Sequence, residues 1–208
     1  MTELEAALAV ADDDAWLRAA QAELGRDPDG LPRLFAAAPR RLGRAEAGGW
    51  TADAAGRAVL LATVLDAPGG PARITELYRY GDSGEKLAIL RALPVLPDPG
   101  GLPATAVPLL RDALRTNDKR LVAAALGPYA RHLDQAAWRQ GVLKCVFMGI
   151  PLSAVDLLEE RADVELAVML DGLAAERAAA GRALAADAVT LLRRLTTAAG
   201  GQSTAKEA

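Results

Sequence analysis

The sequence contains one cysteine, Cys145, and one histidine, His132, among its 208 residues. A single cysteine excludes an internal disulfide and a cluster of thiolates around zinc. A single histidine removes most transition-metal sites, cysteine–histidine dyads and serine–histidine–aspartate triads, because each needs an imidazole beside a fitting partner. We therefore expect no metal and no cofactor, and we expect His132 at the surface near a helix end rather than as a catalytic base.

Basic charge and long hydrophobic runs are also scarce. The net charge is −3, so no basic surface is expected that could gain affinity by neutralising a phosphate backbone, and nucleic acid is not an expected partner. The longest uncharged runs, AVLLATVL and CVFMGIPLSAV, are shorter than the roughly 18 residues that a membrane-spanning helix needs. Because the N-terminal segment is acidic and unlike a signal peptide, we expect a cytoplasmic protein that does not span a membrane.

Aromatic residues make up 4% of the chain and β-branched residues are few, whereas alanine and leucine dominate, which favours helices over strands. Capping residues and helix breakers recur at short intervals. The sequence predicts an all-α fold, an irregular bundle or short superhelix of about nine or ten short helices packed as antiparallel, HEAT-like hairpins, without a fixed repeat. We expect a single domain over 1–198 and a disordered tail over 199–208.

Several boundaries can be predicted. Asp134 begins a helix that runs to Met148, and Gly48-Gly49 separates a helix over Leu31–Leu42 from an apolar core helix that begins after Thr51. The proline-rich segment Pro94–Pro103 is the clearest loop and the expected hinge.

Lys144 lies in the otherwise apolar stretch GVLKCVFMGIPL, whose hydrophobic residues point in all directions around a helix. A buried ammonium group needs an anionic partner unless its aliphatic stem lets it reach water. The candidate partners are Asp82 and Glu85 earlier in the chain and three acids downstream, Asp156, Glu159 and Glu160. Three interpretations stay open: a structural ion pair, recognition of an anionic ligand or partner, and a Schiff-base amine with a lowered pKa.

Further charged and aromatic residues have two interpretations each. The segment that holds Arg161, Glu176, Arg177 and Arg182 is either a solvated helix face or part of a binding site. The aromatic residues either fill the core or anchor an oligomer interface; they are Trp16, Trp50, Trp138 and Phe35.

Two segments resemble the EboA family of bacterial proteins over about residues 78–182. They carry YGD at Tyr80–Asp82, Glu85-Lys86, LRALP at Leu90–Pro94, QGVLK at Gln140–Lys144, Arg161-Ala162, Glu176-Arg177 and Gly181-Arg182. The chain departs from the family pattern at four positions. Arg139 and Asp163 stand where the family commonly has asparagine, and Ala175 and Ala178 stand where it has histidine and tryptophan.

The resemblance implies an all-helical accessory protein that is encoded beside a membrane prenyltransferase-like protein and metabolic-enzyme homologues, in gene sets for making or moving secondary metabolites. It assigns no reaction. One hypothesis is therefore a non-enzymatic helical interaction protein that binds proteins of the same pathway. The alternative is a protein that binds an anionic small molecule, or an enzyme, whose pocket collects charged and polar side chains; the candidates are Lys144, Arg161, Asp82, Glu85, Gln140 and Arg177.

Overall fold

The computed structural model describes residues 2–98 and 100–204, and only the backbone of residues 198–204. Contacts between residues divide the chain into two compact units, Met1–Leu109 and Leu110–Ala208. The expected single domain over 1–198 stays a prediction.

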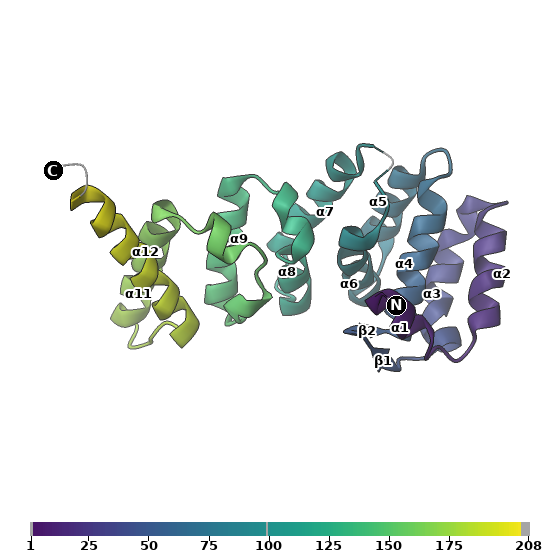
Figure 1. Ribbon diagram of the computed structural model, residues 1–208, viewed down its shortest axis with the longest axis horizontal. Coiled ribbons are helices and arrows are strands. Elements are labelled where there is room, and N and C mark those ends of the chain that lie inside the picture. The colour runs from purple at the N-terminus through teal and green to yellow at the C-terminus, as the bar shows by residue number, and fades with distance from the viewer. Residues whose placement is uncertain (1, 99, 205–208) are drawn as a thin grey trace. The chain divides into compact units, whose positions relative to one another are not determined.

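The fold is all-α, as the composition predicted (Figure 1). The described residues form twelve α-helices, where about nine or ten were expected. In the N-terminal unit the elements are α1 (Glu3–Leu8), α2 (Asp14–Leu24), the 3₁₀ helix η1 (Pro28–Gly30), α3 (Leu31–Leu42), β1 (Glu46–Ala47), β2 (Trp50–Thr51), α4 (Ala52–Leu65), α5 (Gly70–Tyr80), α6 (Ser83–Ala92) and η2 (Leu93–Val95).

Helix α7 (Leu102–Arg115) contains the division between the units. The remaining elements are α8 (Lys119–Ala125), η3 (Pro128–His132), α9 (Gln135–Met148), η4 (Leu152–Ala154), α10 (Leu158–Arg161), α11 (Val164–Ala179) and α12 (Ala186–Thr204). The backbone of the last helix extends to Thr204, so it includes the first residues of the predicted tail. The part of the predicted tail over 205–208 lies outside the described residues.

The segment around Gly48 and Gly49 is a β-hairpin, where the sequence predicted only a break between helices. Strands β1 and β2 pair antiparallel, with Ala47 opposite Trp50. Both glycines have a positive φ, 60° and 76°. A tight two-residue hairpin turn needs such φ angles, and glycine adopts them more readily than residues with a side chain. The strands are too short for their alternation to be read from the sequence.

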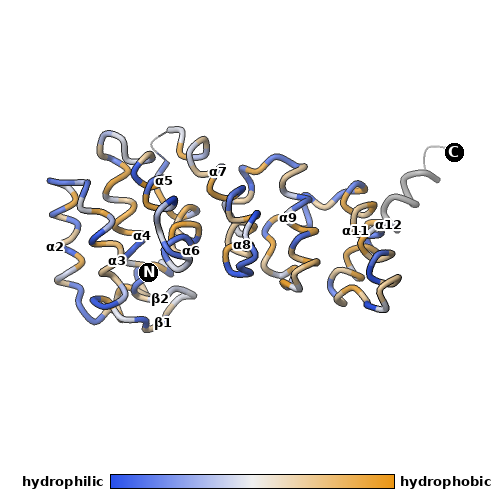
Figure 2. Tube along the Cα trace, turned by 180° about the vertical axis from the view of Figure 1, so that it is seen from behind, coloured by the Kyte–Doolittle hydropathy of each residue, from blue (hydrophilic) through white to orange (hydrophobic). Residues whose placement is uncertain are grey.

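Helix α4 forms the centre of the N-terminal unit. It contacts α1, α2, α3, α5 and α6, and every residue from Ala52 to Ala58 is buried. Leu60 and Val64 lie on this helix, which the sequence predicted as a core helix, and both are fully buried. Small alanine side chains over its first two turns let the neighbouring helices approach closely, so this helix is enclosed almost all round. Figure 2 shows hydrophobic positions along the helices and hydrophilic ones concentrated at loops and outer turns.

A buried arginine completes the hydrogen bonding of α3. Pro39 lies inside this helix and has no N–H, so it cannot donate to the carbonyl oxygen of Phe35 one turn earlier. The Nε of Arg57 on α4 donates to that oxygen at 3.0 Å, and its guanidinium lies 4.7 Å from the Phe35 ring centre. Burial lowers the pKa of Arg57, while the carboxylate of Asp53, 3.9 Å away, opposes that shift.

The C-terminal unit is built around α9, which contacts α8, α11 and η4. Gly141 lies where α9 meets the preceding helices, and a Cβ there would come within 2.8 Å of the Leu126 side chain. Helices α11 and α12 also lie side by side, which agrees with the expected packing of consecutive helices (Figure 1).

The large aromatic side chains mostly belong to the cores. Phe35 and Trp138 are fully buried, Trp50 is buried and Trp16 is half-buried. The core interpretation is therefore the one that fits Phe35, Trp50 and Trp138.

Candidate functional site

An open groove of about 640 Å³ crosses three helices of the C-terminal unit. Its apolar walls come from Leu114 on α7, Leu143, Phe147 and Met148 on α9, and Leu173 on α11. The polar side chains that share the groove are Arg111, Arg115, Asn117, Gln140, Lys144 and Glu176. The groove thus combines hydrophobic surface with three cations and a single carboxylate.

Lys144 lies in this groove, half-buried on α9. No carboxylate of the described chain forms an ion pair with it, so the acids considered as partners do not serve it in the way the sequence suggested; Glu159, for example, pairs with Arg194. The sequence predicted hydrophobic residues on all sides of the helix at Lys144, but this segment is less buried than expected, because the neighbouring Phe147 is 68% exposed. Because Lys144 is half-buried and lines an open groove, its aliphatic stem can be covered while its ammonium group reaches water, which removes the physical need for a fixed anion.

The other two cations of the groove are already engaged. Arg111 forms an ion pair with Asp134, the N-cap of α9, and Arg115 lies 3.4 Å from Asp112. Sequence reasoning missed both arginines, because they precede α9 by at least twenty positions and only the packing of α7 against α9 brings them into the groove of Lys144. Among the cations lining the groove, Lys144 is the one without a carboxylate partner in the described part of the chain.

Arg161 holds the beginning of α9. Its guanidinium donates to the carbonyl oxygens of Ala130 and Leu133, each at 2.9 Å, and to the side chain of Gln135 at 3.1 Å. It also lies 5.0 Å from the ring centre of buried Trp138. The guanidinium donors of Arg161 thus bind the backbone that leads into α9, so the observed role of Arg161 is structural.

Arg177 holds the other end of the same helix. It extends from α11 and donates to the carbonyl oxygens of Phe147 at 2.8 Å and Val146 at 3.3 Å. The last carbonyls of a helix lack intrahelical partners and carry partial negative charge, so a cation there is favourable. Arg177 therefore supports the Phe147 end of the groove without lining it.

Asp82 and Glu85 belong to the N-terminal unit, where they form a capping box at the start of α6. The Asp82 side chain accepts from the amide of Glu85 at 2.8 Å, and the Glu85 side chain accepts from the amide of Asp82 at 3.0 Å. Of the six predicted site residues, the structure thus brings Gln140 and Lys144 into one groove and Asp82 and Glu85 into one helix cap. Arg161 and Arg177 bind main-chain oxygens at opposite ends of α9.

Two departures from the EboA pattern meet each other in space. Arg139 on α9 binds Asp163, the N-cap of α11, with its Nε 2.9 Å from one carboxylate oxygen. This guanidinium lowers the pKa of Asp163 to about 2. The two substitutions therefore form one ion pair between helices, and neither lies in the groove.

The remaining candidates stand outside the groove. His132 is exposed at the end of η3, as predicted, and its ring centre lies 4.6 Å from that of Tyr129. Cys145 is fully buried, and burial raises the pKa of its thiol to about 11. In the described ranges, no three His, Cys, Asp or Glu side chains gather closely enough to hold a metal ion. None of the helices in the same ranges is long and apolar enough to cross a membrane.

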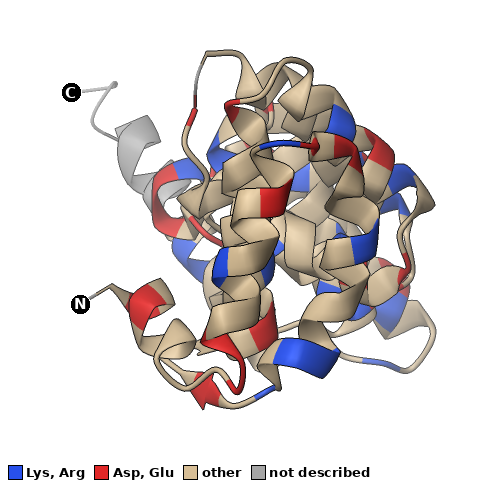
Figure 3. Ribbon diagram, turned by 90° about the vertical axis from the view of Figure 1, so that its right-hand side faces the viewer, with Lys and Arg blue, Asp and Glu red and all other residues tan. Residues whose placement is uncertain are grey.

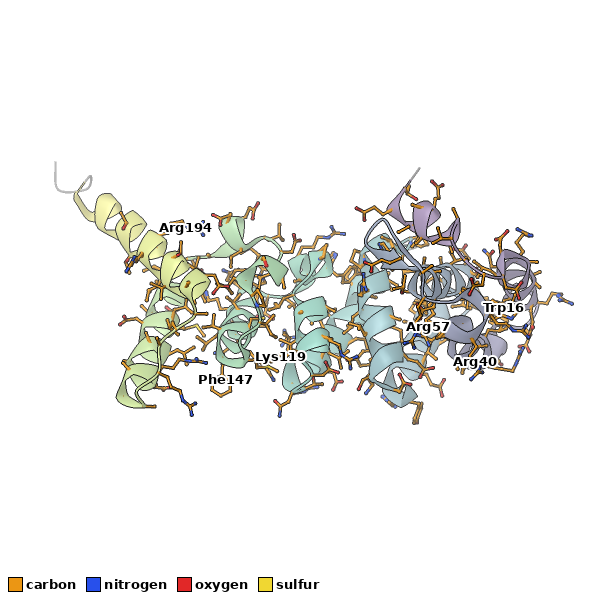
Figure 4. The ribbon with its side chains drawn as sticks, turned by 90° about the horizontal axis from the view of Figure 1, so that it is seen from below. Trp16, Arg40, Arg57, Lys119, Phe147 and Arg194 are labelled. Atoms are coloured by element: carbon orange, nitrogen blue, oxygen red, sulfur yellow. The ribbon has the colours of Figure 1, made fainter. Side chains whose placement is uncertain are left out.

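Phe147 is the most prominent side chain of the groove. It extends away from α9 on the side where Lys119 of α8 also lies (Figure 4). An aromatic ring with 68% exposure beside a half-buried lysine can contact the apolar part of a ligand whose charged group meets the ammonium. The arrangement is suited to binding an anion with an apolar body.

The fold and the groove define an all-helical protein with an amphipathic binding groove. A family model described as "Metabolite traffic protein EboA" matches residues 14–193, and the chain belongs to the EboA family. The match includes most of the N-terminal unit and extends beyond residues 78–182, which carry the resemblance to this family. No curated protein and no solved structure matches the chain.

Proposed function

We propose that this protein is a non-enzymatic accessory protein of metabolite traffic, and that the groove between α7, α9 and α11 binds an anionic metabolite with an apolar body. The observation that carries the proposal is Lys144, which lines the groove beside Phe147 without an ion-pair partner in the described chain. The family description, metabolite traffic, supports a role in holding or passing on a small molecule.

A groove of this kind stabilises a ligand in two ways. Lys144 offers a charge-assisted hydrogen bond to a carboxylate or phosphate, and Gln140, one turn earlier on α9, offers an amide. Phe147, Met148 and Leu173 offer apolar surface at about 25 cal/mol per Å² removed from water. Glu176 faces the same groove and disfavours a ligand with a second negative charge at its end.

The fluorescent probe anilinonaphthalene sulfonate, which joins an anion to an aromatic body, tests this proposal. We expect saturable binding that dodecyl phosphate displaces, below its micelle concentration, and that dodecyltrimethylammonium does not. Lys144→Met should weaken probe binding about tenfold, while Lys144→Arg should retain most of it.

Lys86→Met is the matched control, since Lys86 lies in the N-terminal unit, 5.2 Å from the Tyr78 ring centre. Equal affinity of the wild type and the Lys144→Met variant would show that the groove does not select an anion. Trapping with borohydride in the presence of carbonyl compounds addresses the enzymatic alternative, and an adduct on Lys144 would replace the non-enzymatic proposal.

A second candidate function is the binding of a protein from the same pathway, including the membrane prenyltransferase-like protein that the resemblance implies, at the cytoplasmic side. It is favoured by Val164 and Val168, one turn apart on α11 and 62% and 63% exposed. Two exposed valines on one helix face are typical of a contact surface. Co-purification with the proteins encoded beside it, in wild type and in Val164→Ser/Val168→Ser, tests this candidate; binding that the double variant retains would argue against this surface.

A further inference from the structure

A second groove, of about 520 Å³, lies entirely within the N-terminal unit. One wall comes from η1 and the start of α3, with Pro28 and Pro32. The other comes from α5 and the start of α6, with Glu76, Tyr80 and Glu85. Nothing in the proposed anion-binding function uses this groove.

The one cation of the second groove is fully engaged. Arg73 lies 2.8 Å from Asp29, and it also donates to the carbonyl oxygen of Pro68. This ion pair balances Asp29. The charge that is left in the groove is therefore that of Glu76 and Glu85.

Both glutamates keep acceptor capacity. Glu76 forms no hydrogen bond or ion pair with the described residues, and Glu85 uses one oxygen, Oε2, to accept from the amide of Asp82. The field of buried Arg57 also reaches Glu85, but the donors of Arg57 serve Phe35 and Asp53. The groove thus has two carboxylates with a surplus of negative charge, which is complementary to a cation.

Tyr80 adds an aromatic face to these carboxylates. Its side chain is 76% exposed, the largest fraction among the exposed large hydrophobic side chains of the described chain. An arginine or lysine can lie over such a ring and meet a carboxylate at the same time. A small amine would leave most of its surface in water here, because pockets for small ligands bury most of the ligand and a ring this exposed encloses little.

We propose that this groove docks a segment of a partner protein that carries an arginine next to proline or other apolar residues. The arginine lies over Tyr80 and binds Glu76 and Glu85, and the apolar residues cover Pro28 and Pro32. Tyrosine and arginine are enriched among the residues that dominate protein interfaces, and charge complementarity selects the partner.

A short fluorescein-labelled peptide, Pro-Arg-Pro-Leu-Pro-Arg-Pro, tests the proposal by fluorescence anisotropy with the full-length chain. We expect saturable binding and a loss of about tenfold when citrulline, the neutral isostere, replaces arginine. Glu76→Gln/Glu85→Gln should weaken binding to a similar extent, since glutamine at position 85 retains the helix cap. Tyr80→Ala should weaken it independently.

Glu165→Gln, an exposed acid of the C-terminal unit, is the matched control and should leave peptide affinity unchanged. The proposal is overturned if the arginine and citrulline peptides bind equally or if the glutamine variants keep full affinity. It is also overturned if free arginine amide binds as tightly as the peptide, because then no chain segment is recognised. Probe binding at Lys144 is measured separately, so either proposal can fail alone.

Discussion

Helix α4 of the N-terminal unit is surrounded by apolar contacts from five other helices, whereas helix α9 of the C-terminal unit is held at its two ends by arginines from other elements. The long-range polar bonds differ accordingly. In the first unit the buried Arg57 donates to the carbonyl oxygen of Phe35 on α3, which has no donor within its own helix. In the second, Arg161, Arg177 and the Arg139–Asp163 pair join elements at half-exposed positions.

This difference bears on where a groove can form. A helix enclosed on all sides offers no surface, while a helix fixed at its ends leaves its middle turns accessible. Gln140 and Lys144 lie on those middle turns of α9, between the arginine contacts. Arg161 and Arg177 therefore hold the two ends of α9 in place without occupying the groove.

Removing Arg57 should cause the largest loss of stability. Arg57→Met leaves the Phe35 carbonyl oxygen and the Asp53 carboxylate buried without their partner, and we expect the free energy of unfolding to fall by about 3 kcal/mol. Chemical denaturation measures this change. Arg40→Met is the control, because Arg40 lies exposed on the same helix, α3 (Figure 4). Equal stability of the two variants would show that the apolar core alone holds α3.

Removing Arg161 should have a smaller effect that is confined to one unit. Arg161→Met loses two bonds to carbonyl oxygens that can partly turn to water, and we expect a cost of about 2 kcal/mol. Hydrogen exchange followed by mass spectrometry should show faster exchange in η3 and at the start of α9. Arg182→Met, at an exposed position, should not change exchange there. Faster exchange in α4 instead would contradict the prediction that the hydrogen bonds of Arg161 stabilise only the C-terminal unit.

Acid should weaken the Arg139–Asp163 pair specifically. Since the pKa of Asp163 falls from 3.8 to about 2, its contribution is present above pH 4 and is lost as the pH falls through 2. One-third of the Asp163 side chain is exposed, so after screening we expect about 1 kcal/mol. Asp163→Asn keeps a capping residue and should flatten the dependence of stability on pH between these values. An unchanged pH profile of the variant would assign the acid sensitivity elsewhere.

The smallest effect is expected from thiol modification of the folded protein. Cys145 is fully buried next to Lys144, and the rise of its pKa from 9.0 to about 11 reduces the thiolate fraction at neutral pH about a hundredfold. A chromogenic disulfide reagent should react slowly with the native chain and rapidly after denaturation. Rapid native reaction would reveal frequent opening of α9 and would revise the view that its clamped ends keep it closed.

The sequence predicted those elements whose local signals agree with their packing. The helix over Leu31–Leu42 was correctly placed because glycines flank an apolar stripe, and the start of α9 was correctly placed because Asp134 caps it. The hairpin at Gly48-Gly49 was missed, since two-residue strands leave no pattern.

The candidate site was predictable only in part, because its members come from separate helices. The Gln140–Lys144 string could be selected, while Arg111 and Arg115 carry no local signal and depend on how α7 packs. Conversely, Arg161 and Arg177 have the charge expected of a binding site, but their geometry toward carbonyl oxygens exists only in the folded chain. Charges of both signs are interspersed on the ribbon seen in Figure 3, so charge alone does not mark a site.

The missing amide hydrogen of Pro39 makes two positions of the chain mutually dependent. A relative with any other residue there regains the N–H, and its α3 can satisfy the Phe35 oxygen without help. In such a relative a hydrophobic side chain at position 57 would be tolerated, whereas in this chain it would leave the carbonyl oxygen of Phe35 without a hydrogen-bond donor. Proline at one site and arginine at the other should therefore be gained and lost together across the family, a correlation that a collection of sequences can test without any structure.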